Sequence, residues 1–260
     1  MSVYRIRPLN CGSISSGLRE YWGGRLTGSF IEVPSIIWLI EGGPYPILVD
    51  SAFHSVENGR KGGQWICSRS PEEEPEYQLR KAGVDPKEVK MVLLTHMHWD
   101  HDGCVGMFPN ATKYVWRREL QYWAAPCRTQ VKPFEAPCLG SNHTAPWVAD
   151  RATFQPVDEQ SEILPGITYF PMPGHTIGEC GIAVKADSGT YVLSGDLLST
   201  YACPGRPEAW PELDTHSVVG QTYSLQMAAE SLRRIVHIAS SKKHILPSHD
   251  PKAFDREVYK

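Results

Sequence analysis

Side chains that commonly bind metal ions are concentrated in one short run of the sequence. Positions 95–101 read T-H-M-H-W-D-H and hold three histidines and one aspartate within six residues. His96 and His98 are two residues apart, so in extended chain their side chains point to the same side. Asp100 and His101 follow past a turn and can approach the same point from another direction. Imidazole and carboxylate together favour zinc and related first-row ions over calcium or magnesium.

Three later segments also end an apolar stretch in a potential ligand. Positions 169–176 read Y-F-P-M-P-G-H-T, 192–196 read V-L-S-G-D, and 244–249 read H-I-L-P-S-H. They contribute His175, Asp196 and His249. A single histidine or aspartate at a strand end is more often a capping or solvated side chain. Four such segments in one chain instead indicate a shared metal site.

Strand and helix signals place each of these segments at the end of a strand. Residues 91–95 form an apolar run of strand length without polar alternation, which is typical of a strand buried on both faces. Residues 124–151 show no clear period, and we expect an irregular excursion that forms a lid or pocket wall. Stacked sheets with helices outside, in one domain over residues 1–260, are the predicted α+β fold. The other expected strands are 4–8, 31–40, 46–50, 113–116, 167–170, 181–186, 191–193 and 244–246, and the expected helices are 75–82, 117–123 and 222–240.

Composition and charge narrow the class of partner. Hydrophobic residues make up 41% and charged residues 21%, as in ordinary globular proteins. The net charge of -3 gives no electrostatic reason to expect nucleic acid or an anionic membrane as a partner, and the apolar stretches are too short to span a bilayer. The N-terminal residues lack the apolar stretch of a secretory signal, so we expect a cytoplasmic protein. Seven cysteines without a C-x-x-C pair favour small buried side chains over disulfides or a zinc knuckle.

The order H-x-H-x-D-H, P-G-H-T, G-D and S-H-D resembles the metallo-β-lactamase superfamily over residues 46–250. The resemblance implies a four-layer αββα sandwich with two divalent ions, expected to be zinc, at one edge of the sheets. It implies that Asp196 bridges both ions. Asp50, after an early strand, would orient a ligand from behind. The implied ligands of the first ion are His96, His98 and His175, and those of the second are Asp100, His101 and His249.

Within this superfamily the chain is most similar to the N-acyl homoserine lactonases, which implies a quorum-quenching activity on a small molecule. True β-lactamases usually carry cysteine at the position of Asp196. Thioesterases of the glyoxalase II type carry a helical domain after the last metal histidine, and only eleven residues follow His249. Nucleases of the superfamily need a basic surface. A thioester hydrolase, a non-catalytic metal-binding protein and a redox protein with a single iron remain the alternatives.

The lactonase resemblance implies a mechanism and leaves the substrate open. A hydroxide that bridges the ions would attack the carbonyl carbon, and Asp100 would pass a proton to the leaving heteroatom. The family's substrate-contacting tyrosine is replaced by Ser199, which makes Tyr201, two residues further on, the candidate for that contact. The motifs also continue with Gly103-Cys104 and Gly178-Glu179, where the family often has Gly-Gly and Gly-His. Lactones, lactams and other cyclic esters are therefore all candidate substrates, and a homodimer is compatible with the sequence.

Overall fold

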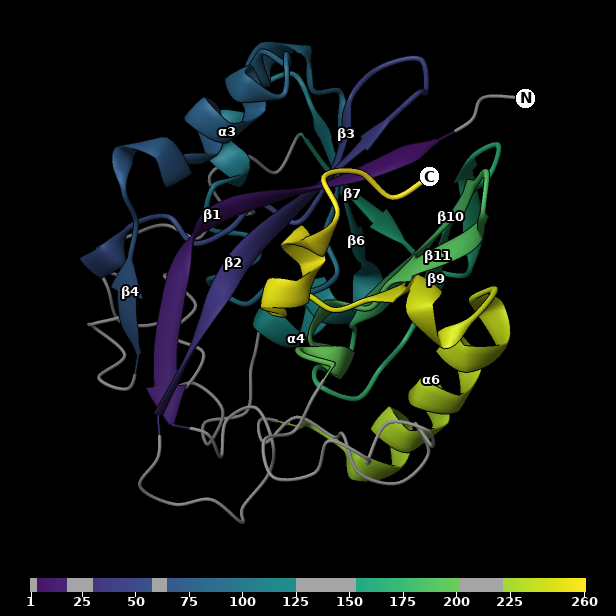
Figure 1. Ribbon diagram of the computed structural model, residues 1–260. Helices are drawn as coiled ribbons and strands as arrows, with labels where there is room; N and C mark the ends of the chain where they lie inside the picture. Colours follow the sequence, from purple (N-terminus) through teal and green to yellow (C-terminus); the bar gives the residue numbers. More distant parts are fainter. Residues whose placement is uncertain (1–3, 18–29, 58–64, 125–152, 202–221) are drawn as a thin grey trace.

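Two mixed β-sheets form the centre of the molecule (Figure 1). The computed structural model describes residues 4–17, 30–57, 65–124, 153–201 and 222–260. One sheet has the strand order β4-β1-β2-β3-β5-β6-β7 and the other has β12-β11-β10-β9-β8. The seven-stranded sheet comprises β1 (Arg5–Gly17), β2 (Phe30–Glu41), β3 (Ile47–Val49), β4 (Ile66–Ser68), β5 (Met91–Leu93), β6 (Thr112–Trp116) and β7 (Phe154–Val157). The five-stranded sheet comprises β8 (Ser161–Leu164), β9 (Ile167–Pro171), β10 (Cys180–Ala186), β11 (Gly189–Leu193) and β12 (Ile245–Leu246).

Alternation of side chains along the central strands builds two separate apolar layers. On β2, Ile36, Trp38 and Ile40 face the core between the two sheets. Ile37 and Leu39 face the opposite side and join a second apolar cluster. Successive side chains of a strand point to opposite faces, so a strand that is apolar at every position is buried on both sides.

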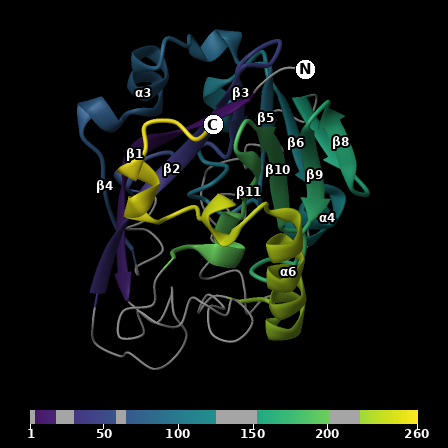
Figure 2. The same cartoon turned by 45° about the vertical axis from the view of Figure 1, so that its right-hand side comes forward.

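Helices cover the outer faces of both sheets. Helix α3 (Pro75–Lys81) inserts Leu79 into the cluster on the outer face of the seven-stranded sheet, and α4 (Arg117–Ala124) adds Trp123 to it. Helix α6 (Leu225–Ile238) packs Leu232 and Ile235 against the five-stranded sheet. Figure 2 shows α6 beside β9–β11 and α3 on the other side of the molecule. The layer order is therefore helix, sheet, sheet, helix, and the expected αββα sandwich is confirmed.

Short 3-10 turns join several of these elements. They are η1 (Pro71–Glu73), η2 (Pro86–Glu88), η3 (Val105–Met107), η5 (Gly195–Leu198), η6 (Lys242–His244) and η7 (Pro251–Asp255). Among the helices in the described part of the chain, none combines the length and hydropathy needed to cross a bilayer. The cysteines of that part, at positions 11, 67, 104 and 180, are buried, as expected.

Most expected elements occur, with differences at their ends. The expected strand at 4–8 is wrong in length, because β1 continues to Gly17 across a register shift between Asn10 and Ser13, with Gly12 at φ 104°. The expected helix at 222–240 begins after Ser224, whose side chain accepts a hydrogen bond from the Met227 amide. Strands β4, β7 and β8 were not expected, since they are short and mostly half-buried or exposed. The expected excursion at 124–151 lies, from residue 125 onward, outside the described residues.

A buried hydrogen bond joins the two sheets next to the metal-ligand run. Tyr169 on β9 donates its hydroxyl to the carbonyl oxygen of Leu94, just past β5, at 2.7 Å. Both residues are fully buried. The carbonyl of Leu94 therefore depends on a side chain from the opposite sheet.

Replacing Tyr169 by Phe tests the strength of this link. Loss of the hydroxyl leaves a buried carbonyl without its donor, and we expect the free energy of unfolding to fall by about 1–3 kcal/mol. Urea denaturation in the presence of a chelator measures this without a contribution from bound ions. Tyr191→Phe is the matched control, because its hydroxyl lies 2.9 Å from the Ser188 hydroxyl in a contact that is only part-buried. An equal loss in both variants would contradict a special role for Tyr169.

Candidate metal centre

The candidate ligands lie where strands of both sheets end at a common edge. The run at 96–101 follows β5, His175 follows β9, Asp196 follows β11 and His249 follows β12. The structure brings all seven side chains together in two groups, and within each group one nitrogen or oxygen of every residue lies within 4.8 Å of the others. The first group is His96, His98, His175 and Asp196, and the second is Asp100, His101 and His249.

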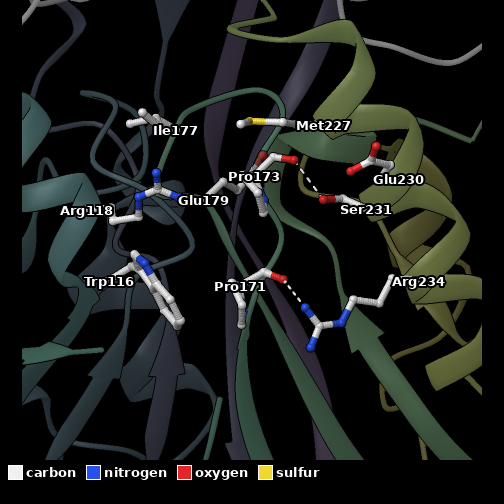
Figure 3. A pocket seen from close by; sticks show the side chains of 11 residues that line it. Trp116, Arg118, Pro171, Pro173, Ile177, Glu179, Met227, Glu230, Ser231 and Arg234 are labelled. Atoms are coloured by element: carbon white, nitrogen blue, oxygen red, sulfur yellow. Dashed lines mark hydrogen bonds between the residues drawn. The ribbon is translucent and has the colours of Figure 1, made fainter. Parts of the chain in front are cut away.

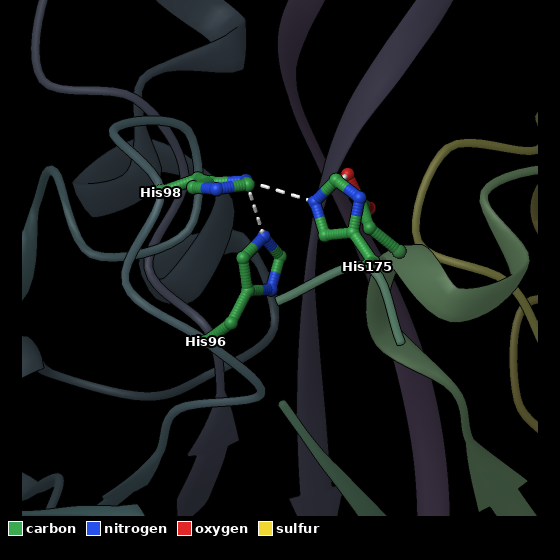
Figure 4. Close-up of side chains that lie close together, drawn as sticks. His96, His98 and His175 are labelled. Carbon is green, nitrogen blue, oxygen red and sulfur yellow. Dashed lines mark hydrogen bonds and ion pairs between the residues drawn. The ribbon is translucent and has the colours of Figure 1, made fainter. Parts of the chain in front are cut away.

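Three imidazole nitrogens converge in the first group (Figure 4). Nε2 of His96 lies 2.9 Å from Nδ1 of His98, which in turn lies 2.8 Å from Nε2 of His175. Three nitrogens of a tetrahedral zinc site with bonds of 2.0–2.1 Å would be about 3.3 Å apart. A small outward movement of each ring would therefore accommodate such an ion, and the donor set fits zinc.

Asp196 lies between the two groups. Its Oδ2 is 3.5 Å from Nε2 of His175, while its Oδ1 is 3.1 Å from Nε2 of His249 and 3.3 Å from Nε2 of His101. Asp100 completes the second group, with Oδ2 at 3.5 Å from Nε2 of His249. Each carboxylate oxygen of Asp196 thus faces one group, which is the geometry required of a bridging ligand.

The protonation of the histidines differs between the two groups. Burial, together with the neighbouring imidazoles, lowers the pKa of His96 and His98 well below the usual value, so these rings are neutral and their lone pairs are available. Burial also disfavours the charged forms of His101 and His249, but nearby carboxylates, above all Asp196, outweigh it and raise the pKa of both. A divalent ion at the second group would compete with protons for these two rings.

Groups behind the ligands set the orientation of the rings. Asp50 places Oδ2 2.8 Å from Nδ1 of His101 and accepts a hydrogen bond from the Thr95 amide at 2.8 Å. Asp50 lies in the left-handed region with φ 61°, an unfavourable conformation that the surrounding contacts maintain. The carbonyl of Pro34 lies 2.9 Å from Nδ1 of His249. With Nδ1 occupied in this way, Nε2 of each ring points into the site.

Helix α6 supports the turn that carries His175. Ser231 donates to the carbonyl of Pro173 at 2.7 Å, and Arg234 donates to the carbonyl of Pro171 at 2.9 Å (Figure 3). A pocket of about 450 Å³ lies beside these contacts, between Trp116 and α6. Its lining contains none of the seven candidate ligands, so it is separate from the metal centre.

Tyr201 lies apart from the seven converging side chains. Its hydroxyl donates to the carbonyl of Ile245 at 2.8 Å, and its amide donates to Asp250. Burial raises the pKa of Tyr201, so it stays protonated. The substrate contact expected of Tyr201 stays a prediction. Trp65 and Trp99 pack together, with 5.7 Å between their ring centroids.

Two buried glutamates were missed by the sequence analysis. Glu119 on α4 and Glu179 at the start of β10 are both fully buried, and burial raises the pKa of both. Oε1 of Glu179 accepts a hydrogen bond from the Leu197 amide at 2.7 Å, next to Asp196. The departure at Gly178-Glu179 from the lactonase pattern was the available signal for Glu179. No comparable signal marks Glu119, which reads as an ordinary helix residue.

The sequence is similar to those of known N-acyl homoserine lactonases over most of the chain. The protein is 27% identical to the N-acyl homoserine lactonase AttM of Azorhizobium caulinodans, over 98% of this chain and 96% of that protein. It is 28% identical to the AttM lactonase of Rhizobium radiobacter, with the same two coverages. A Bacillus sp. N-acyl homoserine lactonase is 22% identical over 84% of this chain and 82% of its own length.

Solved structures share the fold. An N-acyl homoserine lactone hydrolase with the product N-hexanoyl-L-homoserine bound at its metal centre superposes with a TM-score of 0.74 at 21% identity, covering 98% of this chain and 96% of that one. The dizinc quorum-quenching lactonase AidC gives 0.67 at 18% identity, with coverages of 96% and 90%. The sequence profile of the metallo-beta-lactamase superfamily matches residues 31–238. The chain therefore belongs to the metallo-beta-lactamase superfamily.

Proposed function

We propose that the protein is a binuclear metal-dependent hydrolase that opens lactone rings, with N-acyl homoserine lactones and related cyclic esters or amides as the substrate class. The observation that carries this proposal is the position of Asp196, with one carboxylate oxygen toward each ligand group. The similarity to N-acyl homoserine lactonases along nearly the whole chain supports the substrate class.

The donor set supports two ions, and zinc is the proposed metal. His96, His98 and His175 would hold one ion, Asp100, His101 and His249 the other, and Asp196 both. When bound, two such ions supply hydroxide near neutral pH and polarise the substrate carbonyl.

The two aspartates adjust the charge of the site. Two divalent ions carry four positive charges, and Asp100 and Asp196 remove two of them. A hydroxide would remove a third, and the remaining positive charge favours the oxyanion that forms when a carbonyl is attacked. Asp100 retains some exposure, with 13% of its side chain accessible. This exposure suits a group that delivers a proton to the leaving ring oxygen.

Several features remain proposals with support from the sequence alone. They are a cytoplasmic location, a single domain over residues 1–260, a homodimer and a substrate contact by Tyr201. A thioester hydrolase and a non-catalytic metal-binding protein are the competing functions, and both use the same ligands.

Metal content tests the bridging role of Asp196. Wild-type protein should contain two zinc ions per chain by emission spectroscopy after dialysis. Asp196→Ala should bind at least one of them far more weakly, because that variant loses an oxygen from each group. The exposed Asp187→Ala serves as control and should retain both ions. Two ions held equally tightly in Asp196→Ala would contradict the assignment.

A substrate panel tests the reaction. Proton release from N-acyl homoserine lactones should be abolished by a chelator and restored by zinc. Asp100→Ala should reduce kcat/KM by about 10²- to 10⁴-fold, because it removes both a ligand and a proton donor. Acyl thioesters should react much more slowly than lactones. Rapid thiol release with intact lactones would establish the thioesterase instead, and zinc binding without turnover of any ester would establish a non-catalytic protein.

A further inference from the structure

Glu119 is a carboxylate in the first turn of α4 with no access to solvent. Its Oε1 accepts hydrogen bonds from the Met97 amide at 3.1 Å and from Nε1 of Trp123 at 2.9 Å. Its Oε2 accepts from the Thr176 hydroxyl at 2.8 Å and from the Gly178 amide at 3.0 Å. A carboxylate offers about four acceptor positions, and here four donors use them.

The donors belong to the two segments that carry the first ligand group. Met97 stands between His96 and His98, and Thr176 directly follows His175. The two segments come from opposite sheets, after β5 and after β9. Glu119 therefore ties together the backbones that present all three imidazoles. The four hydrogen bonds of Glu119 go to other residues than those of the second group. In that group, Asp50 orients the ring of His101 and the carbonyl of Pro34 orients the ring of His249.

The contact between Glu119 and the turn that follows His175 is tightly packed. A Cβ atom at Gly178 would lie 2.3 Å from the Glu119 nitrogen, so the turn can approach α4 this closely only with glycine at that position. Trp123 donates to Glu119 and also stands edge-on to the His98 ring, at 5.8 Å between centroids. Burying a carboxylate costs free energy, and its four hydrogen bonds offset that cost.

We propose that Glu119 is a positioning residue that holds the three-imidazole group in the arrangement that binds a divalent cation, acting on that ion and not on the other. The inference rests on the proposed function, because it assumes that the two groups bind metal. It assigns Glu119 to one of the two ions only. Glu119 serves the group of His96, His98 and His175. Asp50 has a place in both groups, because it contacts His101 directly and also accepts from the Thr95 hydroxyl, which lies 3.0 Å from Nδ1 of His96.

Glu119→Gln tests this assignment with almost no change in shape. A glutamine has one acceptor oxygen, so its amide nitrogen must face donors on one side. The Thr176 hydroxyl can turn to accept from that nitrogen, whereas the Gly178 amide cannot. We expect zinc affinity of the first group to fall about 10- to 100-fold.

Single-site backgrounds separate the two ions. In His249→Ala the remaining tight ion is that of the first group, and in His175→Ala it is that of the second. Zinc affinity is measured by titration against a chromophoric chelator. Adding Glu119→Gln should lower the affinity in the His249→Ala background and change it by less than twofold in the His175→Ala background. In the otherwise wild-type enzyme loaded with zinc, kcat for a lactone should fall while KM stays near its original value. Glu119→Asp keeps the charge and should recover part of the affinity.

Other outcomes overturn the proposal. Equal weakening in both backgrounds would show a general structural role, and no change in either would show that the contact is irrelevant to metal binding. If circular dichroism shows that Glu119→Gln is unfolded, Thr176→Val removes a single hydrogen bond and should weaken the first group by about three- to tenfold, and unchanged affinity would then overturn the inference. If the wild-type protein does not bind zinc, both the proposed function and this inference are wrong. If wild type and Glu119→Gln bind zinc equally well, this inference alone is wrong.

Discussion

The convergence of seven ligand atoms at one buried edge is the constraint on which the rest of the structure depends. Burying five imidazoles and two carboxylates together costs free energy, because each polar group gives up its contacts with water. Nε2 of His96, Nδ1 of His98 and Nε2 of His175 nevertheless lie within 2.9 Å of their neighbours. Such an arrangement persists only where the surrounding fold holds each side chain in place.

The sandwich supplies that support through strand ends and buried acceptors. Strands of both sheets end beside the site, and a hydrogen bond from Tyr169 to Leu94 connects the sheets there. Behind the ligands, Asp50 fixes His101 and the Thr95 amide, while Glu119 fixes the Met97 and Gly178 amides. Three buried carboxyl groups, including Glu179, thus connect loops that are far apart in sequence. A metal site made from loops becomes precise because its supports lie in the core.

The layers, and the positions of the side chains that converge, could be predicted from the sequence because both follow strong local rules. Residues 91–94 are apolar at every position, which indicates burial on both faces, and Met91 and Val92 do lie in separate cores. The histidines could be located because each follows such a run. The edge strands β4, β7 and β8 lack this signal, since half-exposed strands carry mixed residues. Glu119 could not be found from sequence, because its function depends on contacts with residues 22 and 57 positions away.

The central claim is that two cations occupy adjacent positions with Asp196 between them. Anomalous scattering at the zinc edge, from crystals grown with zinc, measures this directly. The account predicts two peaks about 3.5–4 Å apart, one among His96, His98 and His175 and the other among Asp100, His101 and His249, with an Asp196 oxygen facing each. A single peak, or zinc bound away from these residues, would contradict it.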